Sequence, residues 1–352
     1  IFGNPSSIHQ FGQKSRSLIE KARRQISKSL NCKPNEIIFT GGGSESNNLV
    51  LQGFLKEGDH LITSSYEHPA IMKVAQELEK NNVEVTYINP REDGIINPTD
   101  VEQAIKQNTK LISIMYVNNE LGCINPLSEI VAIAQKKNIK VHTDAVQLIG
   151  KKELNLSVLN VDFLSIAAHK YYGPKGVGAL FIKSGNSLNS TLQGGGQEKN
   201  LRPGTENIAG ISGMGLATQI AIENIKKNSD IILKLENLFL DLLNKHQIIH
   251  QVNGKNRLPG IINITFPILG QTLVMKLDLE GIAVSFGSAC SSGTPKASKV
   301  LLDLGLTDDK ALKTIRISIG KFHTEDDIYL LVKVLNQILN PENQKVNYNY
   351  VK

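Results

Sequence analysis

A lysine stands where the sequence predicts the end of a buried strand, and this placement suggests covalent chemistry. In FLSIAAHKYYGPKGVGALFI (residues 163–182), an apolar run of strand character leads into His169 and Lys170. A Gly-Pro-Lys-Gly turn then leads into a second apolar run. Lysine is rarely buried unless its amine is paired or used. A desolvated lysine has a lowered pKa, and its neutral amine can form a Schiff base with an aldehyde. We therefore expect Lys170 to be a reactive amine.

A glycine-rich turn, Gly41-Gly42-Gly43-Ser44, follows the predicted strand EIIFT and opens a predicted helix. Glycines let backbone N–H groups approach an anion, and a helix N-terminus attracts negative charge. No Lys-Ser/Thr pair follows, so this turn is not the P-loop of a nucleoside triphosphatase. The hypothesis of a nucleotide-binding protein has no support in the sequence other than this turn. The alternative is a plain turn in which Ser44 caps the helix.

Three further polar residues follow predicted strands. Asp144, in VHTDAVQ, either caps the next helix or pairs with a protonated ring nitrogen. Gln147 is placed to face the same way and reach a neighbouring ring oxygen. His68, in SSYEHPA, is either a satisfied surface histidine or stacks on an aromatic cofactor and moves protons near neutral pH.

One ligand accounts for four of these features. An aldehyde cofactor with a phosphate, a pyridine nitrogen and a phenolic oxygen would use Lys170, the glycine turn, Asp144 and Gln147. Pyridoxal phosphate (PLP) has these groups.

Two more residues have types that suit catalysis or binding. Cys290 stands in SFGSACSSGTPKAS, where small polar neighbours predict an exposed, mobile loop and an accessible, nucleophilic thiol. An incidental loop cysteine is the alternative. Arg316 lies in the apolar strand TIRISIG, where its guanidinium needs an anionic partner such as a substrate carboxylate. Cys32 and Cys123 receive no role.

The predicted elements place these residues at the ends of strands. Apolar strands alternate with helices up to the segment GALFI, which predicts an α/β fold with a mostly parallel sheet flanked by helices. In such a sheet, ligands bind outside the carboxyl ends of the strands. A long helical region from about Ile208 to about Lys245 contains the expected domain boundary. We expect a large PLP-binding domain over residues 1–225 and a smaller C-terminal α+β domain over residues 226–352 that carries the cysteine loop.

Composition limits the classes of function. A chain of 352 residues favours two domains. The net charge of +6 comes from scattered lysines, aromatics are only 5% and Trp is absent, so direct nucleic-acid binding is not expected. No apolar run is long enough to cross a membrane. Three widely spaced cysteines argue against disulfides and a metal site and favour a cytoplasmic location.

Eight motifs together resemble a known family. The chain is similar to cysteine desulfurases of the NifS/IscS type, which belong to the class-V aminotransferase superfamily of fold type I PLP enzymes. The resemblance runs from about Phe2 to about His323. The motifs are FGNPSSIHQFGQ, FTGGGSESNN, YEHPA, VNNELG, HTDAVQ, AAHKYYGPKG, RPGTEN and GSACSSG. Family members begin with a strand carrying a motif like YLDNxAxT, which this sequence does not contain.

The resemblance implies a role for each site residue. Lys170 would bind PLP covalently and His68 would stack on its ring. Asp144 would pair with the ring nitrogen and Gln147 with the phenolic oxygen. The substrate carboxylate would be held by Asn119 and Arg316, and Cys290 would accept the sulfur. The cofactor phosphate would be held by Gly43, Ser44, Ser165, His169 and, from the other subunit of a homodimer, Thr205.

The implied reaction removes sulfur from L-cysteine, giving L-alanine and a cysteine persulfide on the enzyme. A sulfur-acceptor protein, such as an iron–sulfur scaffold, would take the persulfide sulfur for cluster assembly. A selenocysteine lyase or another class-V PLP enzyme is the alternative, and in either of these Cys290 would be dispensable or selenocysteine preferred. A non-catalytic protein that keeps the fold is a third possibility.

Overall fold

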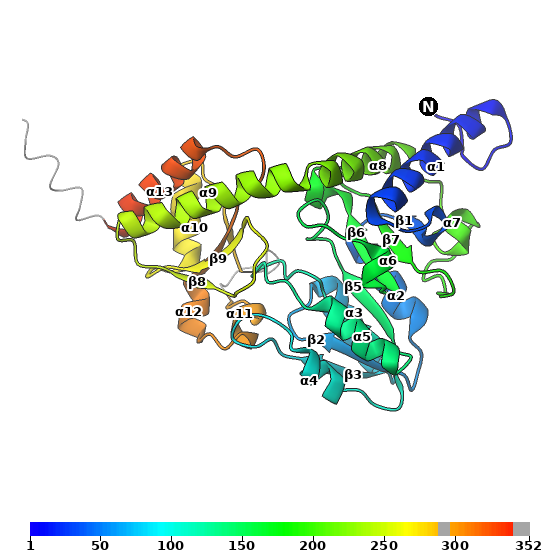
Figure 1. The fold of residues 1–352 in the computed structure, drawn as a ribbon, viewed down its shortest axis with the longest axis horizontal. Helices are drawn as coiled ribbons and strands as arrows, with labels where there is room; N and C mark the ends of the chain where they lie inside the picture. The colour runs from blue at the N-terminus through cyan, green and yellow to red at the C-terminus, as the bar shows by residue number, and fades with distance from the viewer. Residues whose placement is uncertain (288–295, 341–352) are drawn as a thin grey trace, which may run out of the picture. The chain divides into compact units, whose positions relative to one another are not determined.

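The computed structural model describes residues 1–287 and 296–340, which form two compact units (Figure 1). The larger unit consists of residues 1–89, 96–118 and 125–225. The smaller unit begins at residue 226 and also takes in residues 90–95 and 119–124. These two short excursions were not part of the predicted division at residue 225.

A seven-stranded sheet forms the centre of the larger unit, in the order β1-β7-β6-β5-β4-β2-β3. Neighbouring strands from β6 to β3 are parallel, whereas β7 is antiparallel to both β1 and β6. The predicted mostly parallel sheet is thus confirmed. The strands are β1 (Ile37–Thr40), β2 (His60–Ser64), β3 (Glu84–Ile88), β4 (Thr109–Ser113), β5 (Lys140–Asp144), β6 (Phe163–Ala167) and β7 (Gly178–Ile182).

Helices cover this sheet. Every residue of β1, β2 and β6 is buried, and a strand buried on both faces needs cover on both sides. The helices of the larger unit are α1 (Gln10–Leu30), η1 (Pro34–Glu36), α2 (Gly43–Phe54), α3 (Pro69–Lys80), α4 (Pro98–Gln103), α5 (Leu127–Lys136), α6 (Leu156–Leu159), η2 (Ala168–Tyr171), α7 (Gln197–Asn200) and α8 (Ile208–Glu223).

Helix α1 packs closely on α8. Its buried face carries Ile19, Ala22, Ile26 and Leu30, which recur at helical spacing. A Cβ atom at Gly215 of α8 would lie 2.7 Å from Cβ of Ala22, so glycine allows this close contact.

The smaller unit contains a four-stranded antiparallel sheet in the order β10-β11-β9-β8. It confirms the predicted α+β character of the C-terminal part. Its apolar core includes Phe239, Ile264, Ile315 and Leu335. The elements are α9 (Ile225–Lys245), β8 (Gln251–Asn253), β9 (Ile261–Thr265), α10 (Gly270–Leu279), β10 (Ser285–Phe286), α11 (Lys299–Asp303), α12 (Asp308–Leu312), β11 (Thr314–Ser318) and α13 (Glu325–Leu339).

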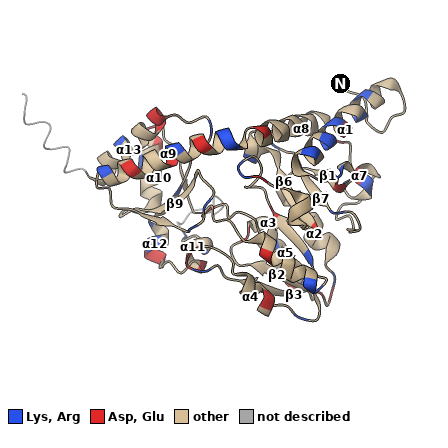
Figure 2. Ribbon diagram, in the orientation of Figure 1, with Lys and Arg blue, Asp and Glu red and all other residues tan. Residues whose placement is uncertain are grey.

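Charged residues of both signs occur on the helices of both units, and α1 carries a dense run of basic residues (Figure 2). Of the helices that the structure describes, none combines the length and apolarity needed to cross a bilayer.

Candidate active site

Six strands of the larger unit end at the same edge of the sheet. Strand β1 runs in the same direction as β6, because each is antiparallel to β7. The carboxyl ends of all strands of this sheet except β7 therefore share one edge, where ligands bind in open α/β sheets. Gly43 and Ser44 follow β1, His68 follows β2, Asp144 ends β5, and Lys170 follows β6.

Asp144 is a buried carboxylate with neutral hydrogen-bond donors. It is 7% exposed, and its Oδ1 accepts a hydrogen bond from the Val146 N–H at 2.9 Å. Its Oδ2 accepts one from Asn47 Nδ2 at 2.7 Å. Burial raises the pKa of Asp144, and the positive charge of Lys170, together with that of His68 when its ring is protonated, acts in the opposite direction. Residues 146–150 form a turn, so Asp144 does not cap a helix.

Asn47, on α2, belongs to this site although the sequence did not point to it. Its side chain is buried at 1% exposure, and its Oδ1 has no hydrogen-bond partner. An asparagine within a predicted helix carries no signal by itself. The contact depends on packing of α2 against β5, which joins positions 97 residues apart.

His68 is the N-cap residue of α3 and is half-buried. Its Nδ1 accepts a hydrogen bond from the Ala70 N–H at 3.1 Å, which places the ring proton of neutral His68 on Nε2. Burial lowers the pKa of His68; the charge of Asp144 raises it and that of Lys170 lowers it. His68 is therefore a neutral imidazole at pH 7, able to give or take a proton.

Glu67, beside His68, is a second buried carboxyl that sequence reasoning missed. Its Oε1 accepts hydrogen bonds from Ser64 Oγ at 2.6 Å and from the Met115 N–H at 2.7 Å, whereas Oε2 has no partner. Burial raises the pKa of Glu67 to about 8, and the charge of Asp144 adds to this effect. The site therefore contains a carboxyl group that is neutral at pH 7. Its position next to His68 in YEHPA was the available signal.

Lys170 lies in η2, three residues beyond the end of β6. The expectation that burial desolvates this amine is wrong for the described chain, because Lys170 is exposed. His169, beside it, is also exposed, and its pKa is lowered by partial burial and by the charges of Lys170 and Lys175. Both side chains are thus accessible to a ligand.

The glycine turn forms the start of α2. The N-cap residue is Gly42 and the helix begins at Gly43, so Ser44 does not cap this helix. A Cβ atom at Gly43 would lie 2.7 Å from Cγ2 of Val146, which means that only glycine fits there without a shift. The N-terminal N–H groups of this twelve-residue helix are a suitable site for an anion.

The structure does not support Ser165 as a phosphate ligand. Ser165 lies inside β6 with no exposed surface, and its Oγ is bonded to Nε2 of His142 at 3.0 Å. The fully buried His142 ring has its pKa lowered to about 3, so this is a neutral pair within the sheet. The sequence motif placed Ser165 near Lys170, but the alternation of the strand directs its side chain elsewhere.

Two other predicted ligands lie on turns. Gln147 is half-buried, and its Oε1 accepts a hydrogen bond from Lys151 Nζ at 3.1 Å. Thr205 is exposed on the segment between α7 and α8. Its predicted contact is with another subunit and remains a prediction.

The predicted substrate ligands Asn119 and Arg316 lie together in the smaller unit. Nη1 of Arg316 donates a hydrogen bond to the backbone oxygen of Asn119 at 2.7 Å, and Nη2 reaches Ser285 Oγ at 3.3 Å. Its buried Nε has no partner. Burial lowers the pKa of Arg316, and the charge of Glu120 raises it. An unpartnered Nε on a desolvated guanidinium fits an anionic ligand.

Cys290 and its predicted mobile loop lie outside the described residues. Of the described cysteines, both are free and poorly suited to nucleophilic chemistry. Burial raises the pKa of Cys32 to about 12 and that of Cys123 to about 11. In the described part of the chain, no three His, Cys, Asp or Glu side chains are grouped as metal ligands.

Comparison with known proteins places the chain in a family. The family model for aminotransferase class-V matches residues 1–331. The chain belongs to the class-V aminotransferase family. The NifS/IscS resemblance is confirmed by a relative from Dictyoglomus turgidum, the cysteine desulfurase IscS. It is 44% identical over 345 residues, which are 96% of this chain and 88% of that protein.

Other relatives agree with this membership. The cysteine desulfurase IscS of Clostridium botulinum is 42% identical over 96% of this chain and 87% of its own length. A solved NifS-like protein has a TM-score of 0.90 and 34% identity, and covers 96% of this chain and 92% of its own. A structure of SspA in complex with cysteine has a TM-score of 0.82 and 37% identity, with 92% coverage of both chains. These matches confirm the predicted class-V fold.

Proposed function

We propose that this protein is a PLP-dependent cysteine desulfurase that converts L-cysteine to L-alanine and retains the sulfur as a persulfide on Cys290. The observation that carries the proposal is the buried Asp144 carboxylate, which lies at the ligand-binding edge of the sheet and is oriented by Asn47 and Val146. His68 and Lys170 are close enough for their charges to change its pKa. This combination suits a ring that carries a protonated nitrogen.

The residues present fit PLP. A cationic ring nitrogen at Asp144 would offset the burial of that carboxylate. Gly43 and Ser44, at the start of α2, are suited to the cofactor phosphate, with His169 as a further donor. Gln147 is assigned to the phenolic oxygen and Lys170 to the aldehyde carbon. His68 is assigned to the ring face.

When bound, PLP withdraws electrons from the Cα atom of an amino acid joined to it. Lys170 is the assigned base for the Cα proton, because its free amine would be able to accept that proton. His68 holds or moves a proton at the substrate sulfur, and its lowered pKa keeps it neutral for this task. Arg316 and Asn119 are assigned to the substrate carboxylate.

Cys290 is assigned as the sulfur acceptor. Its thiolate attacks the sulfur of the substrate, so an S–S bond forms and the C–S bond of the substrate breaks. A proton on Cβ completes L-alanine. The reaction of L-cysteine with the Cys290 thiol thus gives L-alanine and a persulfide, without an added oxidant.

The assembly and the sulfur destination extend this proposal. The active unit is a homodimer in which Thr205 of each chain reaches the phosphate of the other chain's cofactor. The persulfide passes to an acceptor protein for iron–sulfur cluster assembly. The small number of cysteines supports action in the cytoplasm.

An absorption spectrum followed by product analysis tests the proposal. The purified protein should show the visible band of lysine-bound PLP, and L-cysteine with a reductant should yield equimolar sulfide and L-alanine. A protein that binds PLP but prefers selenocysteine, or that transfers amino groups instead, would be another class-V enzyme. A protein that PLP cannot reconstitute would overturn the assignment of Lys170.

A further inference from the structure

The short turn α7, which precedes Thr205, does not have the backbone angles of a right-handed helix. Glu198, Lys199 and Asn200 have φ angles of 43°, 60° and 63°, so three successive residues other than glycine are left-handed. This conformation is unfavourable for residues that have a Cβ atom. Such strain persists only where the surrounding structure fixes it. The contacts of the turn therefore show what holds it.

Glu198 holds the turn through a buried carboxylate. Its Oε1 and Oε2 accept hydrogen bonds from Nη2 and Nη1 of Arg23 at 2.7 and 2.9 Å, and Oε2 also accepts one from the Phe39 N–H at 2.7 Å. The side chain of Glu198 is 3% exposed and that of Arg23 is 10% exposed. Arg23 also donates to the backbone oxygen of Ile37 at 2.6 Å. Arg23 is carried by α1, and hydrogen bonds to the backbone of β1 hold both Arg23 and Glu198.

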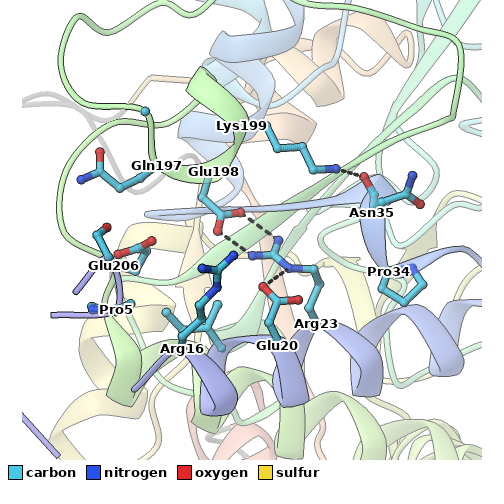
Figure 3. A pocket seen from close by; sticks show the side chains of 13 residues that line it. Pro5, Arg16, Glu20, Arg23, Pro34, Asn35, Gln197, Glu198, Lys199 and Glu206 are labelled. Atoms are coloured by element: carbon cyan, nitrogen blue, oxygen red, sulfur yellow. Dashed lines mark hydrogen bonds and ion pairs between the residues drawn. The ribbon is translucent and has the colours of Figure 1, made fainter. Parts of the chain in front are cut away.

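Figure 3 shows this arrangement at a cavity of about 670 Å³ that lies between α1 and the turn. Glu198 and Lys199 point from the turn toward α1 and η1, and Lys199 Nζ bonds to the backbone oxygen of Asn35. Glu20 contacts the same Arg23 from the solvent side at 3.2 Å, with 41% of its side chain exposed. None of the residues assigned to chemistry lines this cavity.

Two contacts hold the segment between the turn and Thr205. The Gly204 N–H donates to Oε1 of Gln197 at 3.0 Å, which joins the residue before Thr205 to the residue before Glu198. Nε of Arg202 lies 3.0 Å from Oε1 of Glu45, whose Oε2 accepts a hydrogen bond from the Gly41 N–H at 2.8 Å. The segment is thus closed on itself through Gln197 and tied to α2 through Arg202.

We propose that Glu198 is a positioning residue that locks the strained left-handed turn and thereby presents Thr205 to the cofactor phosphate of the other subunit. The proposal rests on the proposed function, because it takes PLP and the homodimer from there. It adds that the buried Arg23–Glu198 pair of one chain determines cofactor affinity in its partner. Glu198 itself does not touch substrate or cofactor.

Hybrid dimers test this role in trans. Each hybrid has one Lys170→Ala chain and one chain with Lys170, so that only one site shows the lysine-bound PLP band. Glu198→Gln is placed in either chain, and PLP is titrated by absorbance. With Glu198→Gln in the Lys170→Ala chain, the dissociation constant of PLP should rise about tenfold, the size of one lost hydrogen bond. With Glu198→Gln in the other chain, it should stay within about twofold of the parent hybrid. Equal effects in both hybrids, or a larger effect in the second, overturn the proposal.

Controls separate positioning from loss of folding. Glu20→Gln removes the exposed partner of the same Arg23 and should leave PLP affinity unchanged. Without cofactor, Glu198→Gln should speed amide hydrogen exchange of Leu201 to Thr205 but not of β5. Adding Lys199→Gly and Asn200→Gly, which lowers the cost of the left-handed turn, should restore part of the PLP affinity. Absence of this rescue, or equally fast exchange in β5, contradicts a positioning role.

A failure of the proposed function would look different. The wild-type protein would then lack the lysine-bound PLP band or be monomeric in solution. The hybrids address Glu198 only when the wild-type dimer shows that band.

Discussion

Asn47 donates a hydrogen bond from Nδ2 to Oδ2 of Asp144 at 2.7 Å, although 97 positions separate the two residues. The Val146 N–H holds the other carboxylate oxygen at 2.9 Å. Both donors are neutral, so they orient the buried carboxylate without neutralising it. The orientation of Asp144 is therefore set by α2 and by the turn after β5.

Asp144→Asn should separate cofactor binding from catalysis. The variant keeps the shape of the side chain but loses the charge that would hold a ring proton. We expect the lysine-bound PLP band to persist and sulfide production from L-cysteine to fall by about 100-fold or more, the effect of removing one preorganised charge partner. Asp241→Asn, on an exposed part of α9, is the control. Sulfide production by Asp144→Asn at a rate within about twofold of wild type would show that Asp144 has no electrostatic role.

Glu67→Gln should change how stability depends on pH. The pKa of Glu67 is raised from 4.5 to about 8 in the folded chain, so between these values the folded state keeps a proton that the unfolded state releases. The stability contributed by this bound proton is greatest below the pKa of Glu67 in the unfolded chain. As the pH rises toward 8 it is lost, and the free energy of unfolding falls by up to about 1.4 kcal/mol per pH unit.

Denaturant unfolding from pH 5.5 to 8.5 measures this effect. The free energy of unfolding of Glu67→Gln, relative to wild type, should increase with pH across this range, because glutamine stays neutral. A difference that does not vary with pH would mean that Glu67 is ionised throughout.

Gly43→Ala should weaken PLP binding through a steric clash. The added Cβ would lie 2.7 Å from Cγ2 of Val146, so the start of α2 must shift. We expect the dissociation constant of PLP to rise roughly tenfold. Val146→Ala removes the clashing methyl group and, combined with Gly43→Ala, should restore most of the affinity. If the double variant binds PLP as poorly as Gly43→Ala, the clash is not the cause.

Arg316→Lys should raise the KM for L-cysteine about tenfold or more, with a smaller effect on kcat. Lysine keeps the charge but lacks the planar guanidinium that can bind a carboxylate through two hydrogen bonds. Steady-state kinetics measures the change, and Lys313→Gln, at the end of α12, is the control. An unchanged KM would remove Arg316 from the substrate site.

The sequence predicted the order of strands and helices in the larger unit well, because buried parallel strands are continuous apolar runs separated by amphipathic helices. GALFI coincides with β7. Strand β8, with only three residues, carries too short a pattern to be recognised. The predicted helical region near residues 208–245 is two helices, α8 and α9, which meet at Asn224.

The sequence correctly located Asp144 at the end of a strand and His68 after one, and the roles assigned to them stay proposals. Asn47 and Glu67 were missed because their contribution comes from contacts between distant segments. Ser165 was assigned wrongly because motif spacing does not tell which face of a strand a side chain occupies. The exposure of Lys170 differs from the expectation because the chain turns into η2 after β6.

The most direct test of the central claim is a single-turnover reaction of the PLP-loaded protein with L-cysteine in the absence of reductant, with mass analysis of the Cys290 peptide. The wild type and Cys32→Ser should each gain one sulfur atom on Cys290 and release one equivalent of L-alanine. Cys290→Ser should keep the lysine-bound PLP band but form no persulfide. L-Alanine release at the wild-type rate by Cys290→Ser, or no added sulfur in the wild type, would contradict the account.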